Sequence, residues 1–127
     1  MERVAVSVVA PFFNEVESAL LLHCELVAVL SRLGKPFEII FVDDGSSDGT
    51  FRKIRELSPI RAIRLTRRYG QTAVFACGIA AARGAIVVTM DGDLENRPED
   101  VLRLLAKLAE GYDVVAGTGS FSSRSNT

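Results

Sequence analysis

Acidic side chains follow an apolar run of this sequence at a spacing that suits a charged ligand. Asp91 and Asp93 come directly after the run 85–90 (AIVVTM), and Glu95 adds a third acid. Carboxylates this close repel one another unless a positive charge neutralises them. A hard divalent cation meets that need, and Mg²⁺ often combines one or two carboxylates with substrate phosphates. The alternative is a solvated acidic turn that caps the following helix.

Two more polar clusters follow apolar runs near the amino terminus. The segment 43–50 (DDGSSDGT) follows the run 38–42 (EIIFV), and there Asp44 can accept hydrogen bonds from a base or a ribose. The segment 11–15 (PFFNE) offers Phe13 to a nucleobase face and Glu15 to its polar edge. The alternatives are a turn with a helix cap for the first cluster, and core aromatics with helix-start electrostatics for the second.

A basic segment, 67–71 (RRYGQ), completes the set of residues that could do chemistry. Its two arginines supply charge-assisted donors suited to a pyrophosphate. The alternative is a solvated basic turn.

Strand-length apolar runs alternate with helix-period stretches, and this alternation must position the clusters. We expect strands at 4–10, 38–42, 61–65, 85–90 and 113–116. We expect helices at 16–33, 50–57 and 71–83, and a fourth that starts at Pro98 and buries Leu104 and Leu108. Such a pattern predicts an α/β fold of three layers with a mostly parallel sheet. Ligands of open parallel sheets bind outside the carboxyl ends of the strands, where the clusters fall.

The length, the net charge and the apolar content argue against several classes of protein. The 127 residues suit one domain, and the net charge of −1 argues against a nucleic-acid partner. No apolar stretch reaches the roughly 18 residues that a membrane-spanning helix needs. Cys24 and Cys77 are expected to be buried free thiols, and His23 a helix-surface or hydrogen-bonded residue rather than a catalytic one.

Taken together, the segments VSVVAPFFNE, FVDDGSSDGT, RRYGQTAVFACGI and VVTMDGDLENRPED resemble family 2 glycosyltransferases of the GT-A fold. Within that family they are most similar to enzymes that transfer a sugar from a nucleotide sugar to a polyprenyl phosphate. The resemblance implies a UDP- or GDP-linked donor, a Mg²⁺ or Mn²⁺ ion, and a metal-assisted displacement that inverts the anomeric carbon. It also implies a protein at the cytoplasmic face of a membrane, with this chain itself soluble.

The resemblance assigns roles to particular positions. Asp91 and Asp93 are the implied catalytic residues, with Asp93 and Glu95 on the metal; Glu95 stands where relatives usually carry Gln. The residues implied to bind the nucleotide are Pro11, Phe13, Glu15, Val42, Asp44 and Gly92.

The carboxyl-terminal part departs from the family pattern. Relatives continue with an acceptor-binding segment and further basic residues, whereas here the segment 113–117 runs into GTGSFSSRSNT. We therefore expect a truncated GT-A domain at 1–117, a flexible tail at 118–127, and impaired transfer. An exposed sheet edge would promote self-association into a homo-oligomer.

Competing functions lack their own signatures. A nucleotidyltransferase or a dinucleotide-binding dehydrogenase would carry a glycine-rich loop after the first strand, where this chain has APFFNE. A phospho-receiver would place its acid pair there. A remnant that binds a nucleotide but transfers nothing is the remaining alternative.

Overall fold

The computed structural model describes residues 3–90, 99–100, 103 and 120–123. Its strands are β1 (Val6–Phe12), β2 (Phe37–Asp43), β3 (Arg61–Arg64), β4 (Ile86–Thr89) and β5 (Ser120–Ser123). Its helices are α1 (Val16–Leu30), the short 3₁₀ helix η1 (Ser31–Leu33), α2 (Thr50–Ile54) and α3 (Gln71–Ala81). Every predicted strand and helix before residue 91 is present, with ends that differ by a few residues.

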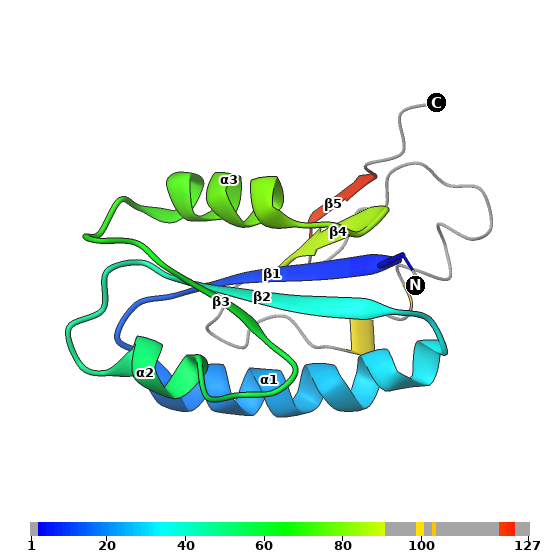
Figure 1. Cartoon of the computed structure of the whole chain (residues 1–127), viewed down its shortest axis with the longest axis horizontal. Coiled ribbons are helices and arrows are strands. Elements are labelled where there is room, and N and C mark those ends of the chain that lie inside the picture. The colour runs from blue at the N-terminus through cyan, green and yellow to red at the C-terminus, as the bar shows by residue number, and fades with distance from the viewer. Residues whose placement is uncertain (1–2, 91–98, 101–102, 104–119, 124–127) are drawn as a thin grey trace.

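The strands form one sheet in the order β3-β2-β1-β4-β5. The first four are parallel, and β5 is antiparallel to β4. Helices α1 and α2 cover one face of the sheet and α3 covers the other, as Figure 1 shows. This arrangement confirms the predicted three-layer α/β class.

Each face of the sheet has its own apolar core, because neighbouring residues of a strand point to opposite faces. Phe12, Leu26 and Phe41 belong to the core under α1 and α2. Val9 and Val74 belong to the core under α3. There α3 lies very close to the sheet, since a Cβ added at Gly78 would stand 2.3 Å from a methyl group of Val9.

The sequence also predicts a helix, a strand and a tail after residue 90. Of the helix expected from Pro98, the described residues Glu99, Asp100 and Arg103 are helical. The strand expected at 113–116 lies outside the described residues. Within the segment 118–127, expected to be a flexible tail, residues 120–123 form β5, because β4 offers unpaired backbone groups to a neighbouring strand. The tail stays a prediction.

His23 and Cys24 lie in α1, and Cys77 lies in α3. His23 is buried, and its Nε2 donates a hydrogen bond of 2.8 Å to the carbonyl of Pro59, so it is the hydrogen-bonded residue expected. Both cysteines are free, but Cys24 is exposed and Cys77 half-buried, so the expectation of buried thiols is wrong. Cys24 follows the buried residues Leu22 and His23 and thus faces away from the core.

A polar network ties the strands together at their amino-terminal edge. One oxygen of Glu38 accepts hydrogen bonds from the Ser7 hydroxyl and the Arg83 backbone N–H, both at 2.6 Å. The other forms an ion pair of 2.9 Å with Arg61, and the N–H of Gly84 donates to Ser7 at 2.8 Å. Burial raises the pKa of Glu38, but the bonds from Ser7, Arg83 and Arg61 outweigh it, and the net effect lowers that pKa.

Candidate functional site

Three loops meet at the carboxyl edge of β1, β2 and β3. The N–H of Asp44 donates a hydrogen bond of 2.8 Å to the carbonyl of Phe12, and the N–H of Leu65 donates one of 2.9 Å to the carbonyl of Asp43. These bonds continue the pairing of the three strands past their ends. The structure therefore brings the predicted clusters 11–15, 43–50 and 67–71 to one edge of the sheet.

Asp44 connects the second loop to the start of α3. Its side chain is 5% exposed, and its two oxygens accept the backbone N–H groups of Tyr69 at 2.8 Å and Gly70 at 3.1 Å. Gly70 immediately precedes α3 and has a φ of 101°, which a residue with a side chain rarely adopts. Asp44 thus fixes the turn at which the chain enters α3.

Asn14 connects the first loop to the second. Its Oδ1 accepts the N–H of Ser47 at 3.0 Å, while its own N–H donates to the hydroxyl of Ser46 at 2.8 Å. Its φ is 51°, in the left-handed region that Asn tolerates better than most residues. No role was predicted for Asn14, although an Asn between a strand and a helix is a signal for such a turn.

Phe13 lies beneath a cation from the third loop. The guanidinium of Arg68 stands 4.0 Å from the centroid of the Phe13 ring, and that of Arg67 stands 5.0 Å from the Tyr69 ring. The loops approach so closely that a Cβ at Gly45 would stand 2.4 Å from the backbone carbon of Arg67. An aromatic face, a carboxylate and two arginines therefore lie within one small region of the surface.

Tyr69 is part of the same basic loop and is half exposed. Hydrogen bonds with Thr66 and Arg67 lower the pKa of its phenol, because they favour the ionised oxygen. The phenol adds a polar group to the edge at which Arg67 already provides positive charge.

Asp43 is a second acid at this edge, for which no role was predicted. Its side chain has no exposed surface, and its Oδ2 accepts the N–H of Ser46 at 3.1 Å. Its Oδ1 is buried and has no hydrogen-bond partner among the described residues. Because a buried carboxylate oxygen is costly to leave unpaired, this atom marks a place for a further donor.

The other predicted nucleotide-binding residues have different surroundings. Pro11 is half-buried at the end of β1, and Glu15 is exposed at the residue that precedes α1. The side chain of Val42 is completely buried and packs in the core under α3. Any contact between Val42 and a ligand would therefore involve its backbone.

Asp91, Gly92, Asp93 and Glu95 lie outside the described residues. The chain reaches them from Met90, whose N–H donates to the carbonyl of Val9 at 2.9 Å, so it leaves β4 beside β1. Among the residues that are described, no group of three or more His, Cys, Asp or Glu side chains could hold a metal ion. In the same part of the chain, no helix is long and apolar enough to cross a bilayer.

Comparison with known protein families gives a match to Glycosyl transferase family 2 over residues 7–127. Two curated relatives are undecaprenyl-phosphate 4-deoxy-4-formamido-L-arabinose transferases. The one from Pectobacterium carotovorum is 44% identical over 115 residues, and the one from Klebsiella pneumoniae is 42% identical over the same length. The aligned region is 87% of this chain but 35% of each relative, so the chain spans about a third of their length.

Solved structures of similar fold include two from other organisms. A mannosyltransferase from Pyrobaculum calidifontis, in complex with GDP-Man and Mn²⁺, aligns with a TM-score of 0.68 and 25% identity over 88% of this chain and 34% of its own. A mannosyl-3-phosphoglycerate synthase from Rubrobacter xylanophilus aligns with a TM-score of 0.74 and 22% identity over 87% of this chain and 38% of its own. The second likeness shows the fold alone.

Proposed function

Because the chain belongs to glycosyl transferase family 2, we propose that it is the donor-binding part of a polyprenyl-phosphate sugar transferase. The donor would be a nucleotide-diphosphate sugar and the acceptor a polyprenyl phosphate. Two observations support this: the curated relatives act on undecaprenyl phosphate, and the mannosyltransferase of similar fold holds GDP-Man. We propose residues 1–117 as this donor-binding part.

The convergence of Phe13, Asp44 and Arg68 at one sheet edge carries the proposal. A nucleobase needs an aromatic or planar face and a polar partner for its edge. The Phe13–Arg68 stack provides the face, and the second lone pairs of the Asp44 oxygens provide acceptors for a base or ribose. Pro11 and Glu15 would border the same pocket, with the backbone of Val42 beneath it.

The acids that follow β4 complete the proposed site. We assign Asp91, Gly92 and Asp93 to the diphosphate side of the donor, with Asp93 and Glu95 as the residues that would hold Mg²⁺ or Mn²⁺. Mn²⁺ in the mannosyltransferase complex supports a divalent ion in this family. When bound, such an ion stabilises the negative charge that develops on a departing diphosphate.

The proposed reaction is a direct displacement at the anomeric carbon. An oxygen of the acceptor phosphate forms a bond to that carbon while the bond to the nucleoside diphosphate breaks, which inverts the carbon. The acceptor oxygen is already ionised near neutral pH, so the step needs no dedicated general base. Arg67 and Arg68 would balance charge on the diphosphate.

The substrates also bear on where the parent protein works. A polyprenyl phosphate is a membrane lipid, which supports a place at the cytoplasmic face of the membrane, where nucleotide sugars are available. The homo-oligomer stays a prediction, which light scattering of the purified chain would check.

Calorimetric titration with UDP and GDP, with and without Mn²⁺, tests the donor site. We expect one nucleotide to bind in the presence of Mn²⁺, and Asp93→Ala and Asp44→Asn to weaken it at least about tenfold, since each removes a charged partner. Glu56→Gln, at an exposed acid in the turn after α2, is the matched control and should bind normally. Absence of binding by the unaltered chain would refute the donor site and leave the fold assignment in place.

A transfer assay with undecaprenyl phosphate then separates a transferase from a chain that only binds the nucleotide.

A further inference from the structure

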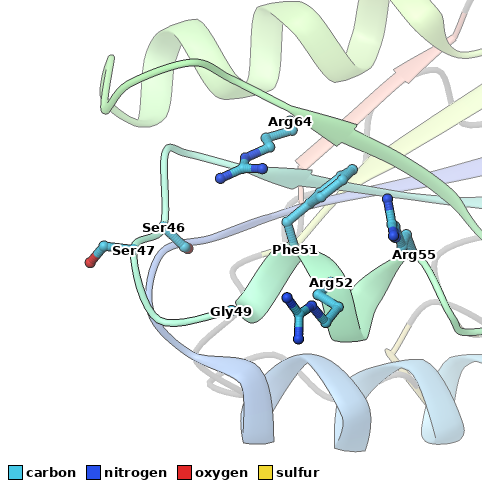
Figure 2. Close-up of a pocket in the computed structure, with 7 residues that line it drawn as sticks. All are labelled: Ser46, Ser47, Gly49, Phe51, Arg52, Arg55 and Arg64. Carbon is cyan, nitrogen blue, oxygen red and sulfur yellow. The ribbon is translucent and has the colours of Figure 1, made fainter.

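A surface pocket of about 280 Å³ opens between α2 and the end of β3. It is lined by Ser46, Ser47, Gly49, Phe51, Arg52, Arg55 and Arg64. Figure 2 shows that the aromatic and basic side chains come from α2, the residue that follows it and β3, with the loop 46–49 as the remaining border. The pocket is thus bounded by one continuous segment, 46–55, and by Arg64 at the end of β3.

The pocket collects positive charge that the described chain leaves unneutralised. The described residues form two ion pairs, Arg61–Glu38 and Arg103–Asp100, so Arg52, Arg55 and Arg64 have no carboxylate partner there. Arg52 and Arg55 are three residues apart on a helical turn, where like charges repel. In a chain with a net charge of −1, three guanidinium groups around one hollow are a local excess that an anion would relieve.

One of the three arginines is held in place. Arg64 is the last residue of β3, and its guanidinium lies 5.5 Å from the centroid of the Phe51 ring. Stacking on an aromatic face leaves the edge N–H groups of a guanidinium available for a planar or tetrahedral oxyanion. Ser46 is buried, and its hydroxyl accepts the N–H of Asn14, which leaves the hydroxyl proton available as a further donor.

The pocket is distinct from the proposed donor site. The basic groups of the donor site, Arg67 and Arg68, stack on Tyr69 and Phe13 and do not line the pocket. The two sites share only the loop after β2, which contributes Asp44 to one and Ser46 to the other.

We infer that this pocket, which we call the arginine pocket, binds a phosphoryl group separately from the nucleotide-sugar donor. Guanidinium groups are the side chains best suited to bidentate recognition of phosphate oxygens. The volume lies near the lower limit of small-molecule sites, roughly 300 Å³, which suits a diphosphate or a phosphate monoester better than a whole nucleotide. The group can come from a soluble diphosphate or from the headgroup of an anionic lipid.

Two binding measurements on the chain test the arginine pocket and its source of phosphate. The first is calorimetric titration with inorganic pyrophosphate in the absence of divalent metal. The second is co-sedimentation with vesicles of phosphatidylcholine alone or with added phosphatidic acid. We expect binding in at least one of them, and the one that shows it identifies the source.

The double variant Arg52→Gln/Arg55→Gln removes two charges from the pocket, one on α2 and one on the residue after it, both exposed. We expect it to weaken binding at least about tenfold, as the loss of charge-assisted hydrogen bonds implies. The control variant Arg32→Gln/Lys35→Gln removes the same charge from exposed positions just after the carboxyl-terminal end of α1, and it should bind normally. Arg67→Gln/Arg68→Gln should also bind normally here, although it would weaken nucleotide binding.

Three outcomes would overturn the inference. They are no binding in either measurement, equal losses in the pocket and Arg32/Lys35 variants, or a loss confined to the Arg67/Arg68 variant. The last would assign the phosphate to the donor site, and failure of nucleotide binding alone would leave the arginine pocket intact.

Discussion

Glu38 shows how a single carboxylate can join three strands. Its oxygens accept bonds from Ser7, Arg61 and the backbone of Arg83, so it links β1, β2 and β3 to the segment before β4. We predict that Glu38→Gln lowers the free energy of unfolding by about 1–3 kcal/mol, because the buried donors then face a neutral amide. Urea denaturation measures this loss. Glu56→Gln, on an exposed acid without such partners, should change stability by less than about 0.5 kcal/mol.

The lowered pKa of Glu38 also predicts how stability depends on pH. A carboxyl group with a lower pKa in the folded state contributes stability above its unfolded pKa, near the ordinary value of 4.5. That contribution is lost as the pH falls below this value and through the folded pKa. Denaturation from pH 7 to pH 3 should therefore show a smaller acid-induced loss in Glu38→Gln than in the unaltered chain. Equal losses in the two proteins would contradict the assignment.

Residue types alone predicted which edge of the sheet carries the site, but not how its side chains are paired. Phe13 and Asp44 follow apolar strands, and parallel strands bring their carboxyl ends together. Asn14 escaped notice because its hydrogen bonds with Ser46 and Ser47 join loops that lie about 30 residues apart in the chain. The unpaired oxygen of Asp43 escaped notice because it follows from the burial of that side chain in the folded protein. Spacing along the chain does not encode such contacts.

At the scale of elements, the spacing of apolar residues predicted where the helices lie better than it predicted which of their residues are buried. Leu20 and Leu21 fit the apolar spacing of α1, yet they are 39% and 50% exposed. The predicted end of that helix at residue 33 is a 3₁₀ turn, η1, which tightens the chain before Gly34. Strand β5 could not be predicted, because the residues 120–123 (SFSS) carry no apolar alternation and pair only through the backbone of β4.

Helix α3 provides the clearest prediction for an element. Alanine normally stabilises a helix by about 1 kcal/mol relative to glycine. At Gly78, however, the added carbon would stand 2.3 Å from a methyl group of Val9 in the middle of the sheet. We predict that Gly78→Ala destabilises the chain by about 1–3 kcal/mol through overpacking. Thermal denaturation followed by circular dichroism measures the change.

An exposed position of α3 supplies the comparison for Gly78. Ala80→Ser adds an atom of similar size where the side chain faces solvent, and should cost less than about 0.5 kcal/mol. A rise in melting temperature for Gly78→Ala would show that α3 can move away from β1 without loss.

The whole molecule has a polar network at each edge of its parallel sheet, with two apolar cores between them. Ser7 and Glu38 belong to the network at the amino-terminal edge, and Asn14 and Asp44 to the one at the carboxyl edge. On β1, Ser7 lies at the amino-terminal edge and Phe12 at the carboxyl edge. The rise per residue of a strand separates the two by about 16 Å. The first network holds the strands together, while the second shapes the loops of the proposed donor site.

This separation predicts that the two networks act independently. Asn14→Gly removes the acceptor for Ser47 but tolerates the positive φ, and Glu38→Gln weakens the opposite edge. Because residues farther apart than about 10 Å without shared partners rarely couple, the losses in unfolding free energy should add to within about 0.5 kcal/mol in the double variant. Urea denaturation of the unaltered chain, the two single variants and the double variant measures this sum.

Nucleotide titration should respond to Asn14→Gly and not to Glu38→Gln, since only the first alters the loops. A coupling above about 1 kcal/mol, or equal weakening of nucleotide binding by both changes, would mean that the sheet transmits strain from one edge to the other.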